Sequence, residues 1–291
     1  MARMVMVKNK VIVAGAIYHI IQHAPGKEII FVEDKDYLKF LFLLKDAARK
    51  YSLEILAFSL LPNHLHILLK TKEENLSAAL KNFLQRYAMY LNKKYERKGH
   101  VFYGRYRASL CDSDDYFFAI AAYIHLNSFK AGLSDSPFLY RWHSLDVYLK
   151  DIKQSFVNPA PILDLLSGDR DKARKIYCDL IKQAAEIKGL KRKKYIFEFK
   201  GLRNFYKDSI RIITDLAQRD KANSKKLEKL LVTDKWIKEF REKKCLKSPQ
   251  SIKAKRYVVE QLLSRGLGIN DIAEYLQIDR SSIYRLLHIR H

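Results

Sequence analysis

The sequence predicts an α+β fold in its first half and an all-helical region in its second. Runs rich in β-branched and aromatic residues, each of strand length, alternate with amphipathic helical stretches up to about residue 150. Beyond that point only helical periodicity remains, with many lysines. The 291 residues are enough for about two domains of ordinary size.

The elements of the first half follow in a definite order. Strands are predicted over residues 11–23, 53–60, 64–70 and 101–110, and Pro62-Asn63 turns the second strand into the third. Helices are predicted over about 34–48 and 75–95, and a third begins at residues 112–114 and runs through Asn127. Strand, helix, hairpin, helix and strand make a ferredoxin-like (RRM-like) antiparallel sheet, whose last helix is able to cross the opposite face.

Three segments are expected: a domain over 1–150, a helical basic linker region over 151–247, and a helix-turn-helix over 248–291. In the last, Ser248-Pro249 begins a helix that Gly266 and Gly268 end, and Asn270-Asp271 and Asp279 cap two more. The final helix would read base edges in a major groove through Ser281, Ser282, Tyr284 and Arg285. The alternative is a small helical bundle without a DNA role.

The charge balance indicates a polyanionic partner. Lys and Arg total 55 against 32 Asp and Glu, a net charge of +23. Nucleic acid is favoured over a membrane, because no helix combines a basic face with an apolar face rich in Trp or Phe. Lacking a signal peptide or a bilayer-spanning run, the chain is expected to be cytoplasmic. Its three cysteines lie far apart, which favours neither a zinc ribbon nor a disulfide framework.

The third strand carries a pair of candidate metal ligands. Side chains alternate along a strand, so His64 and His66 share one face. With the amide oxygen of Asn127 they would form a mixed site, which Mg²⁺ or Mn²⁺ with open positions fits best. The alternative is two half-buried strand histidines, since nine histidines in 291 residues can produce such a pair by chance.

Tyr123 is the candidate nucleophile, because residues four apart share a helix face and Asn127 lies one turn further on. A phenol activated beside a divalent ion can attack a phosphodiester and form a phosphotyrosine. One phosphodiester replaces another, so resealing needs no nucleotide cofactor, and the sequence has no P-loop motif. The alternative is plain packing, since the chain has 18 tyrosines.

Cations interleaved with aromatic rings indicate contact with single-stranded nucleic acid. The expected phosphate contacts are Arg86, Arg105, Arg107 and Lys130, and the alternative is a solvated basic surface. Five further histidines show no paired spacing and are expected to be structural or exposed: His19, His23, His100, His125 and His143.

Three ordered motifs resemble the single-tyrosine HuH transposases, in particular the REP-associated branch: PNHLHILLK, FYGRYR, and YIHLN followed by Ala131-Gly132-Leu133. The resemblance covers about residues 11–150 and implies that His64 and His66 bind the metal, Tyr123 is the nucleophile and Asn127 is the third ligand. The implied activity is cutting and rejoining of single-stranded DNA beside hairpins, through a 5′-phosphotyrosine. Related enzymes occur as dimers and as monomers, and the extra C-terminal half favours a monomer.

The chain departs from the family pattern in two places. Ser128 and Lys130 replace a proline and an arginine after Asn127, and Gln22-His23-Ala24 replaces Gln-Arg-Gly. Residues 254–282 are similar to the DNA-binding domain of bacterial chromosomal replication initiators, which implies that the tail binds duplex DNA. Two rival hypotheses stay open: a DNA-binding regulator that no longer cuts, and an RNA-binding module, which would leave the paired histidines unexplained.

Overall fold

The computed structural model describes residues 12, 14–26, 28–111, 114–186, 259, 269–276 and 278–287. The predicted linker beyond residue 186 and most of the predicted helix that begins at Ser248-Pro249 lie outside these residues. The three-part division of the chain therefore stays a prediction. No helix within the described ranges is long and apolar enough to cross a bilayer.

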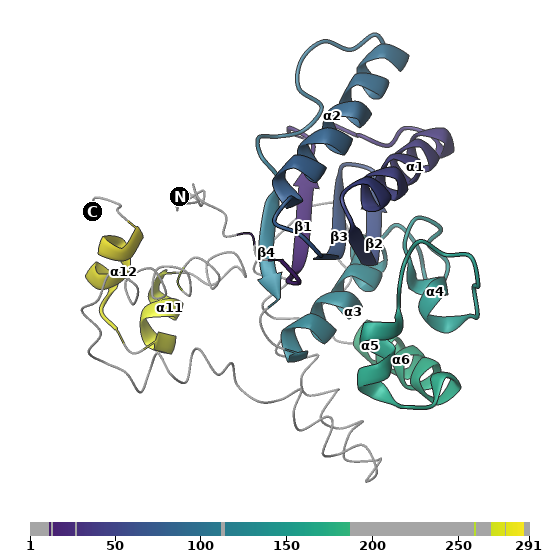
Figure 1. The fold of residues 1–291 in the computed structure, drawn as a ribbon, viewed down its shortest axis with the longest axis vertical. Coiled ribbons are helices and arrows are strands. Elements are labelled where there is room, and N and C mark those ends of the chain that lie inside the picture. The colour runs from purple at the N-terminus through teal and green to yellow at the C-terminus, as the bar shows by residue number, and fades with distance from the viewer. Residues whose placement is uncertain are drawn as a thin grey trace.

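The first half folds into one four-stranded antiparallel sheet (Figure 1). Along the chain its elements are β1 (Ile17–His23), α1 (Asp34–Lys50), β2 (Leu53–Leu61), β3 (His64–Thr71), α2 (Leu76–Lys94) and β4 (Arg107–Cys111). The strand order is β2-β3-β1-β4, with the first strand paired to both the third and the fourth. This βαββαβ arrangement confirms the predicted ferredoxin-like α+β fold.

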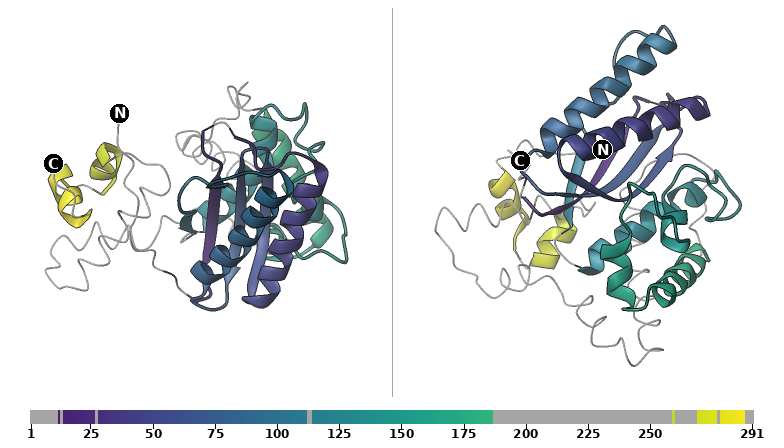
Figure 2. Two further views of the ribbon diagram at one scale, coloured as in Figure 1. Left: turned by 90° about the horizontal axis from the view of Figure 1, so that it is seen from above. Right: turned by 45° about the vertical axis from the view of Figure 1, so that its right-hand side comes forward.

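Helices cover both faces of the sheet (Figure 2). Helices α1 and α2 lie on one face, and α3 (Asp114–Lys130) crosses the other. Along the chain α4 (Leu145–Leu149), α5 (Ala160–Leu166) and α6 (Arg170–Ala185) follow, and α6 packs against α3. One hydrophobic core runs from the sheet through α3 to Ala184. All of β3 except Lys70 is buried, because the strand is covered from both sides.

Two predicted strands are shorter than expected. The first begins at Ile17 because Gly15, with a φ of +76°, turns the chain just before it. The fourth begins at Arg107 instead of at residue 101. The intervening loop turns at Gly104, whose φ is +61°, and the Tyr103 amide donates to the His23 carbonyl at 2.8 Å. This loop therefore covers the end of β1 and does not extend β4.

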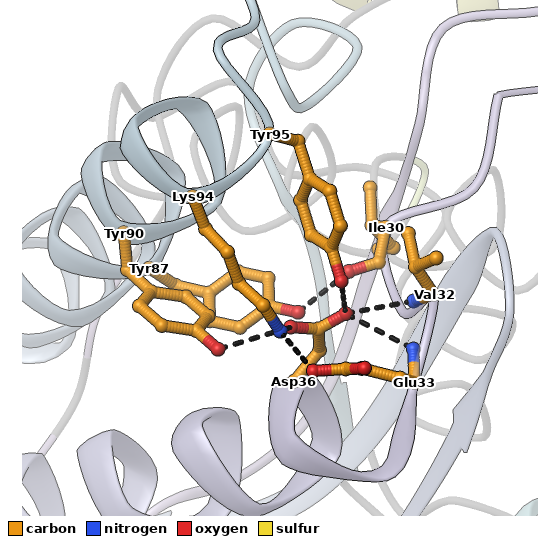
Figure 3. A network of polar contacts seen from close by, with 8 residues as sticks. All are labelled: Ile30, Val32, Glu33, Asp36, Tyr87, Tyr90, Lys94 and Tyr95. Atoms are coloured by element: carbon orange, nitrogen blue, oxygen red, sulfur yellow. Dashed lines mark hydrogen bonds and ion pairs between the residues drawn. The ribbon is translucent and has the colours of Figure 1, made fainter.

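A fully buried carboxylate joins α1 to α2 (Figure 3). Asp36 accepts hydrogen bonds from Lys94 Nζ at 2.5 Å, the Tyr95 hydroxyl at 2.7 Å and the Tyr90 hydroxyl at 3.0 Å. The backbone amides of residues 32 and 33 also donate to it. Burial works to raise the pKa of Asp36, but these bonds outweigh it, so the pKa is lowered. Asp36 thus fixes the start of α1 against the end of α2.

Two short helices are described near the C-terminus: α11 (Ile269–Leu276) and α12 (Arg280–Leu287). They enclose a small apolar cluster of Val259, Ile272, Leu276, Ile283 and Leu287. Asp279 caps α12, as predicted, by accepting from the Ser282 amide at 2.7 Å. The first of the two helices begins one residue before the predicted Asn270 cap.

Candidate active site

The sheet register gathers polar side chains on the face that α3 covers. His66 pairs with Ile21 of β1 and with Ser59 of β2, and His64 pairs with His23. Paired residues of an antiparallel sheet point to the same side, so these side chains share one face with His19, two residues from Ile21. The rings of His64 and His66 lie 5.3 Å apart between centroids. The predicted imidazole pair is therefore present.

Helix α3 places Tyr123 and Asn127 over this pair, one helical turn apart. Asn127 Nδ2 donates to His66 Nε2 at 2.6 Å, and the same amide is hydrogen-bonded to His64 and to the Tyr123 hydroxyl. The ring of Tyr123 stands edge-on to that of His66, with centroids 5.6 Å apart. The four residues predicted to do the chemistry thus meet in one chain, with Asn127 at their centre.

A third imidazole belongs to the same group, and the sequence does not predict it. His19 Nε2 lies 2.9 Å from His66 Nδ1, and the two rings are stacked with centroids 5.2 Å apart. Because His19 has no histidine at paired spacing, the sequence predicts only a structural or exposed residue. The register of β1 against β3, which sets His19 opposite Leu68, brings it diagonally beside His66. The contact joins two strands, and the side-chain periodicity of one strand carries no information about it.

Burial keeps these imidazoles neutral. Burial lowers the pKa of His19 to about 3 and, with the nearby His23, lowers that of His64 to about 4. The pKa of His66 lies well below its ordinary value for the same reason, and His19 and His64 add to the effect. Each ring therefore carries one proton and one lone pair at neutral pH, the form in which histidine binds metal ions.

The donor set fits a hard or borderline divalent ion. Within the described ranges, no group of three or more His, Cys, Asp or Glu side chains is placed to hold a metal ion. An ion here would rest on the two Nε2 atoms of His64 and His66 and on the amide oxygen of Asn127, after rotation of that amide. Such a set leaves positions for phosphate oxygens. The residues present therefore fit Mg²⁺ or Mn²⁺.

The phenol is buried and lies beside a cation. Tyr123 is 3% exposed, and burial raises its pKa although the Asn127 bond works to lower it. Lys130 Nζ lies 5.0 Å from the centroid of the Tyr123 ring. A positive charge at this place favours a developing phenolate. Because the site groups are all less than 10% exposed, a phosphodiester can reach them only after α3 or its neighbours move.

The predicted nucleic-acid contacts lie in different places. Arg107 begins β4 on the face of the histidines, and Arg105 is exposed in the loop before it. Beside Arg105, Tyr103 is 62% exposed, and its ring stacks on that of His23 with centroids 5.3 Å apart. Arg86 instead lies on α2, in the helix layer on the other face, and pairs with Asp46 at 2.5 Å. The structure does not bring it to the site.

Of the residues in α12 predicted to contact DNA bases, two take part in the helix cap and two do not. The hydroxyls of Ser281 and Ser282 donate to Asp279, and this holds the pKa of that carboxyl well below its usual range. Both serines thus take part in the helix cap. Arg285 is exposed and Tyr284 half-buried.

His125, which lies between Tyr123 and Asn127 in sequence, points away from the site. Its Nδ1 is 2.8 Å from the Tyr177 hydroxyl of α6, and its Nε2 is 2.8 Å from Ser144 Oγ. That Ser144 oxygen also accepts from the Phe58 amide of β2 at 2.9 Å. His125 therefore fastens α3 to α6 and to the sheet.

Comparison with known proteins identifies the family of the segment that forms this site. Residues 12–127 match the family model described as "Transposase IS200 like". Among solved structures, the chain is similar to one described as "Structure of the REP associates tyrosine transposase bound to a REP hairpin", with 12% identity and a TM-score of 0.45 over 57% of this chain and 93% of that one. No curated protein matches the chain significantly. The segment 12–127, which spans the sheet and most of α3, is thus similar to the IS200-like transposases.

Proposed function

We propose that this chain cuts and rejoins single-stranded DNA next to hairpins, with Tyr123 as the nucleophile. The observation that carries this proposal is the convergence of Tyr123 and Asn127 on His64 and His66 within one chain. The match of residues 12–127 to a transposase family supports it, because all four residues lie inside the matched segment.

In the proposed reaction the Tyr123 oxygen attacks phosphorus and loses its proton as the new P–O bond forms. The bond from phosphorus to the 3′ oxygen breaks, and that oxygen leaves as a 3′-hydroxyl after gaining a proton. The 5′ phosphate stays on Tyr123 until a 3′-hydroxyl attacks in reverse. His64, His66 and Asn127 would hold Mg²⁺ or Mn²⁺, which supplies charge stabilisation for the phosphate when bound. Lys130 favours the anionic state of the phenol.

Single-stranded DNA would enter beside β4. Arg105 and Arg107 supply positive charge there, and the exposed Tyr103 ring offers a surface on which a base can stack. We further propose that α12 contacts duplex DNA through Arg285 and Tyr284, with Ser281 and Ser282, which bond the capping Asp279, beside them. A complete site within one chain favours action by a monomer.

The test is a denaturing gel that detects a covalent adduct between the full chain and labelled hairpin-bearing single strands in Mn²⁺. The wild type should form the adduct, and Tyr123→Phe should lose it while DNA binding stays within a few-fold. Tyr106→Phe is the matched control, because its hydroxyl contacts Ser77 of α2 on the far side of the sheet. Adduct formation by Tyr123→Phe would overturn the assignment.

A second function has its own support. A regulator that binds DNA without cutting it would tolerate a nucleophile that is buried and whose pKa is raised, as Tyr123 is. The denaturing gel and a native gel together separate the two functions. Such a regulator would retain the hairpin DNA in the native gel and yield no adduct from any strand of a hairpin library in the denaturing gel.

A further inference from the structure

Each of the two proposed metal-binding histidines, His64 and His66, donates one ring N–H to a neighbouring residue. The chemistry of that neighbour indicates which ring nitrogen carries the proton. For His64 the neighbour is Asn63, whose Oδ1 lies 2.8 Å from His64 Nδ1. A carbonyl oxygen only accepts, so the Asn63 contact favours a proton on His64 Nδ1, although His64 is also hydrogen-bonded to Asn127. The lone pair of His64 then belongs to Nε2.

His66 meets its amide partner through the opposite ring nitrogen, Nε2. Asn127 Nδ2 only donates, so His66 Nε2, 2.6 Å away, must be the acceptor and Nδ1 must carry the proton of the neutral ring. His66 Nδ1 therefore donates to His19 Nε2 at 2.9 Å. Both histidines thus have the same tautomer, with their Nε2 lone pairs on the side of Asn127.

Packing alone does not explain a histidine at position 19. Its ring is fully buried, and among the described residues its Nδ1 has no hydrogen-bond partner. A buried donor without a partner costs free energy, and an apolar side chain of similar size would avoid that cost. What the imidazole provides is an acceptor nitrogen directed at His66 Nδ1.

We propose that His19 and Asn63 are positioning residues, which hold His66 and His64 in the Nδ1–H tautomer and so direct both Nε2 lone pairs to one metal ion. This inference rests on the proposed metal site and goes beyond it, because it assigns a task to two residues outside the ligand set. Such partners of ligand histidines fix ring orientation, and their removal typically weakens metal affinity about 10–100-fold.

The first measurement is Mn²⁺ binding to the full chain without DNA, in which electron paramagnetic resonance detects the free ion. We expect His19→Leu and Asn63→Ala to weaken binding about 10–100-fold. His19→Gln and Asn63→Asp keep an acceptor oxygen and should stay within about 5-fold of the wild type. His143→Gln is the matched control, a buried histidine whose Nε2 donates to the Pro137 carbonyl, and should bind like the wild type.

The second measurement needs no metal. Nitrogen-15 chemical shifts of the histidine rings report which nitrogen is protonated, and the wild type should show Nδ1–H for both His64 and His66. His19→Leu should change the His66 tautomer alone, and Asn63→Ala that of His64 alone. A role limited to packing would leave both tautomers unchanged.

The two measurements separate the two hypotheses. If the wild type shows both Nδ1–H tautomers but binds no Mn²⁺, the proposed metal site fails and the positioning of the rings stands as an observation without that ion. If His19→Leu and Asn63→Ala bind Mn²⁺ as tightly as the wild type, or leave the tautomers unchanged while still folded, the positioning role is overturned.

Discussion

Replacing Asp36 with Asn tests how far one buried carboxylate holds α1 and α2 together. The Asp36 side chain is fully buried, and Lys94 is its charged partner at 2.5 Å. Asn keeps the size but removes the charge and turns an acceptor into a donor facing Tyr90, Tyr95 or Lys94. Breaking a buried ion pair costs about 3–5 kcal/mol. Because the Lys94 side chain is 24% exposed, we expect the lower end, about 3 kcal/mol.

For a domain of this size, about 1 kcal/mol corresponds to roughly 2–4 °C in Tm, so Asp36→Asn should lower Tm by about 6–12 °C at pH 7. The pKa of Asp36 is lowered in the folded protein. Its contribution is therefore present above the ordinary carboxyl pKa, and it is lost as the pH falls through the lower folded pKa. The difference in Tm between wild type and variant should shrink below about pH 4.

The assay is thermal unfolding followed by circular dichroism at pH 7, 5 and 3. Asp46→Asn is the control, because Asp46 forms its ion pairs with Arg49 and Arg86 near the surface. We expect that variant to unfold close to the wild type. The reasoning is refuted if Asp36→Asn melts with the wild type at pH 7, or if the two curves stay equally far apart at pH 3.

Three further changes probe the site and its support. Lys130→Met removes a unit charge about 5 Å from the Tyr123 ring, an interaction of about 3 kcal/mol at an effective dielectric constant of 20. After solvent screening, adduct formation should slow by roughly 10–100-fold, and its rate should rise at a higher pH than in the wild type. An unchanged pH–rate profile would contradict the role of Lys130. Arg105→Ala should weaken binding to single-stranded DNA and reduce the slope of log binding constant against log salt concentration by about one. Arg86→Ala should change neither the affinity nor this slope. Equal losses for the two variants in a salt titration would contradict the proposed path of the strand. Tyr177→Phe removes the hydroxyl that bonds a buried imidazole of α3 and should cost about 1–3 kcal/mol in urea unfolding, and full stability would show that this bond does not fasten α3.

Local patterns were enough to predict the order of the strands and helices of the sheet domain, although two strands are shorter than expected, and to predict which side chains meet at the site. Alternation along β3 predicted that His64 and His66 share a face, and helical spacing predicted that Tyr123 and Asn127 share another; the structure brings the two faces together. Both inferences concern residues a few positions apart, for which backbone geometry alone decides the outcome.

The features that the sequence could not predict depend on contacts between distant segments. His19 joins the site only through the register of β1 against β3, 47 residues away. In the sequence, Asp36 is one of several acidic residues at the start of a helix. In the structure, α2 buries it beneath Lys94. Arg86 has the same local signature as Arg105, a cation beside aromatic residues, but it lies on α2, on the other face of the sheet, where it pairs with Asp46. None of these partners can be found by periodicity.

The fastening of α3 through His125 has a consequence for how copies of this protein could cooperate. Handing the tyrosine helix to a neighbouring molecule would pull a fully buried imidazole away from both Tyr177 and Ser144. These two hydrogen bonds oppose an exchange of α3 alone, but an exchange that carries Ser144 and Tyr177 with α3 would keep them. A DNA end joined to Tyr123 is therefore expected to pass to another molecule only if the whole segment from α3 to α6 moves with it.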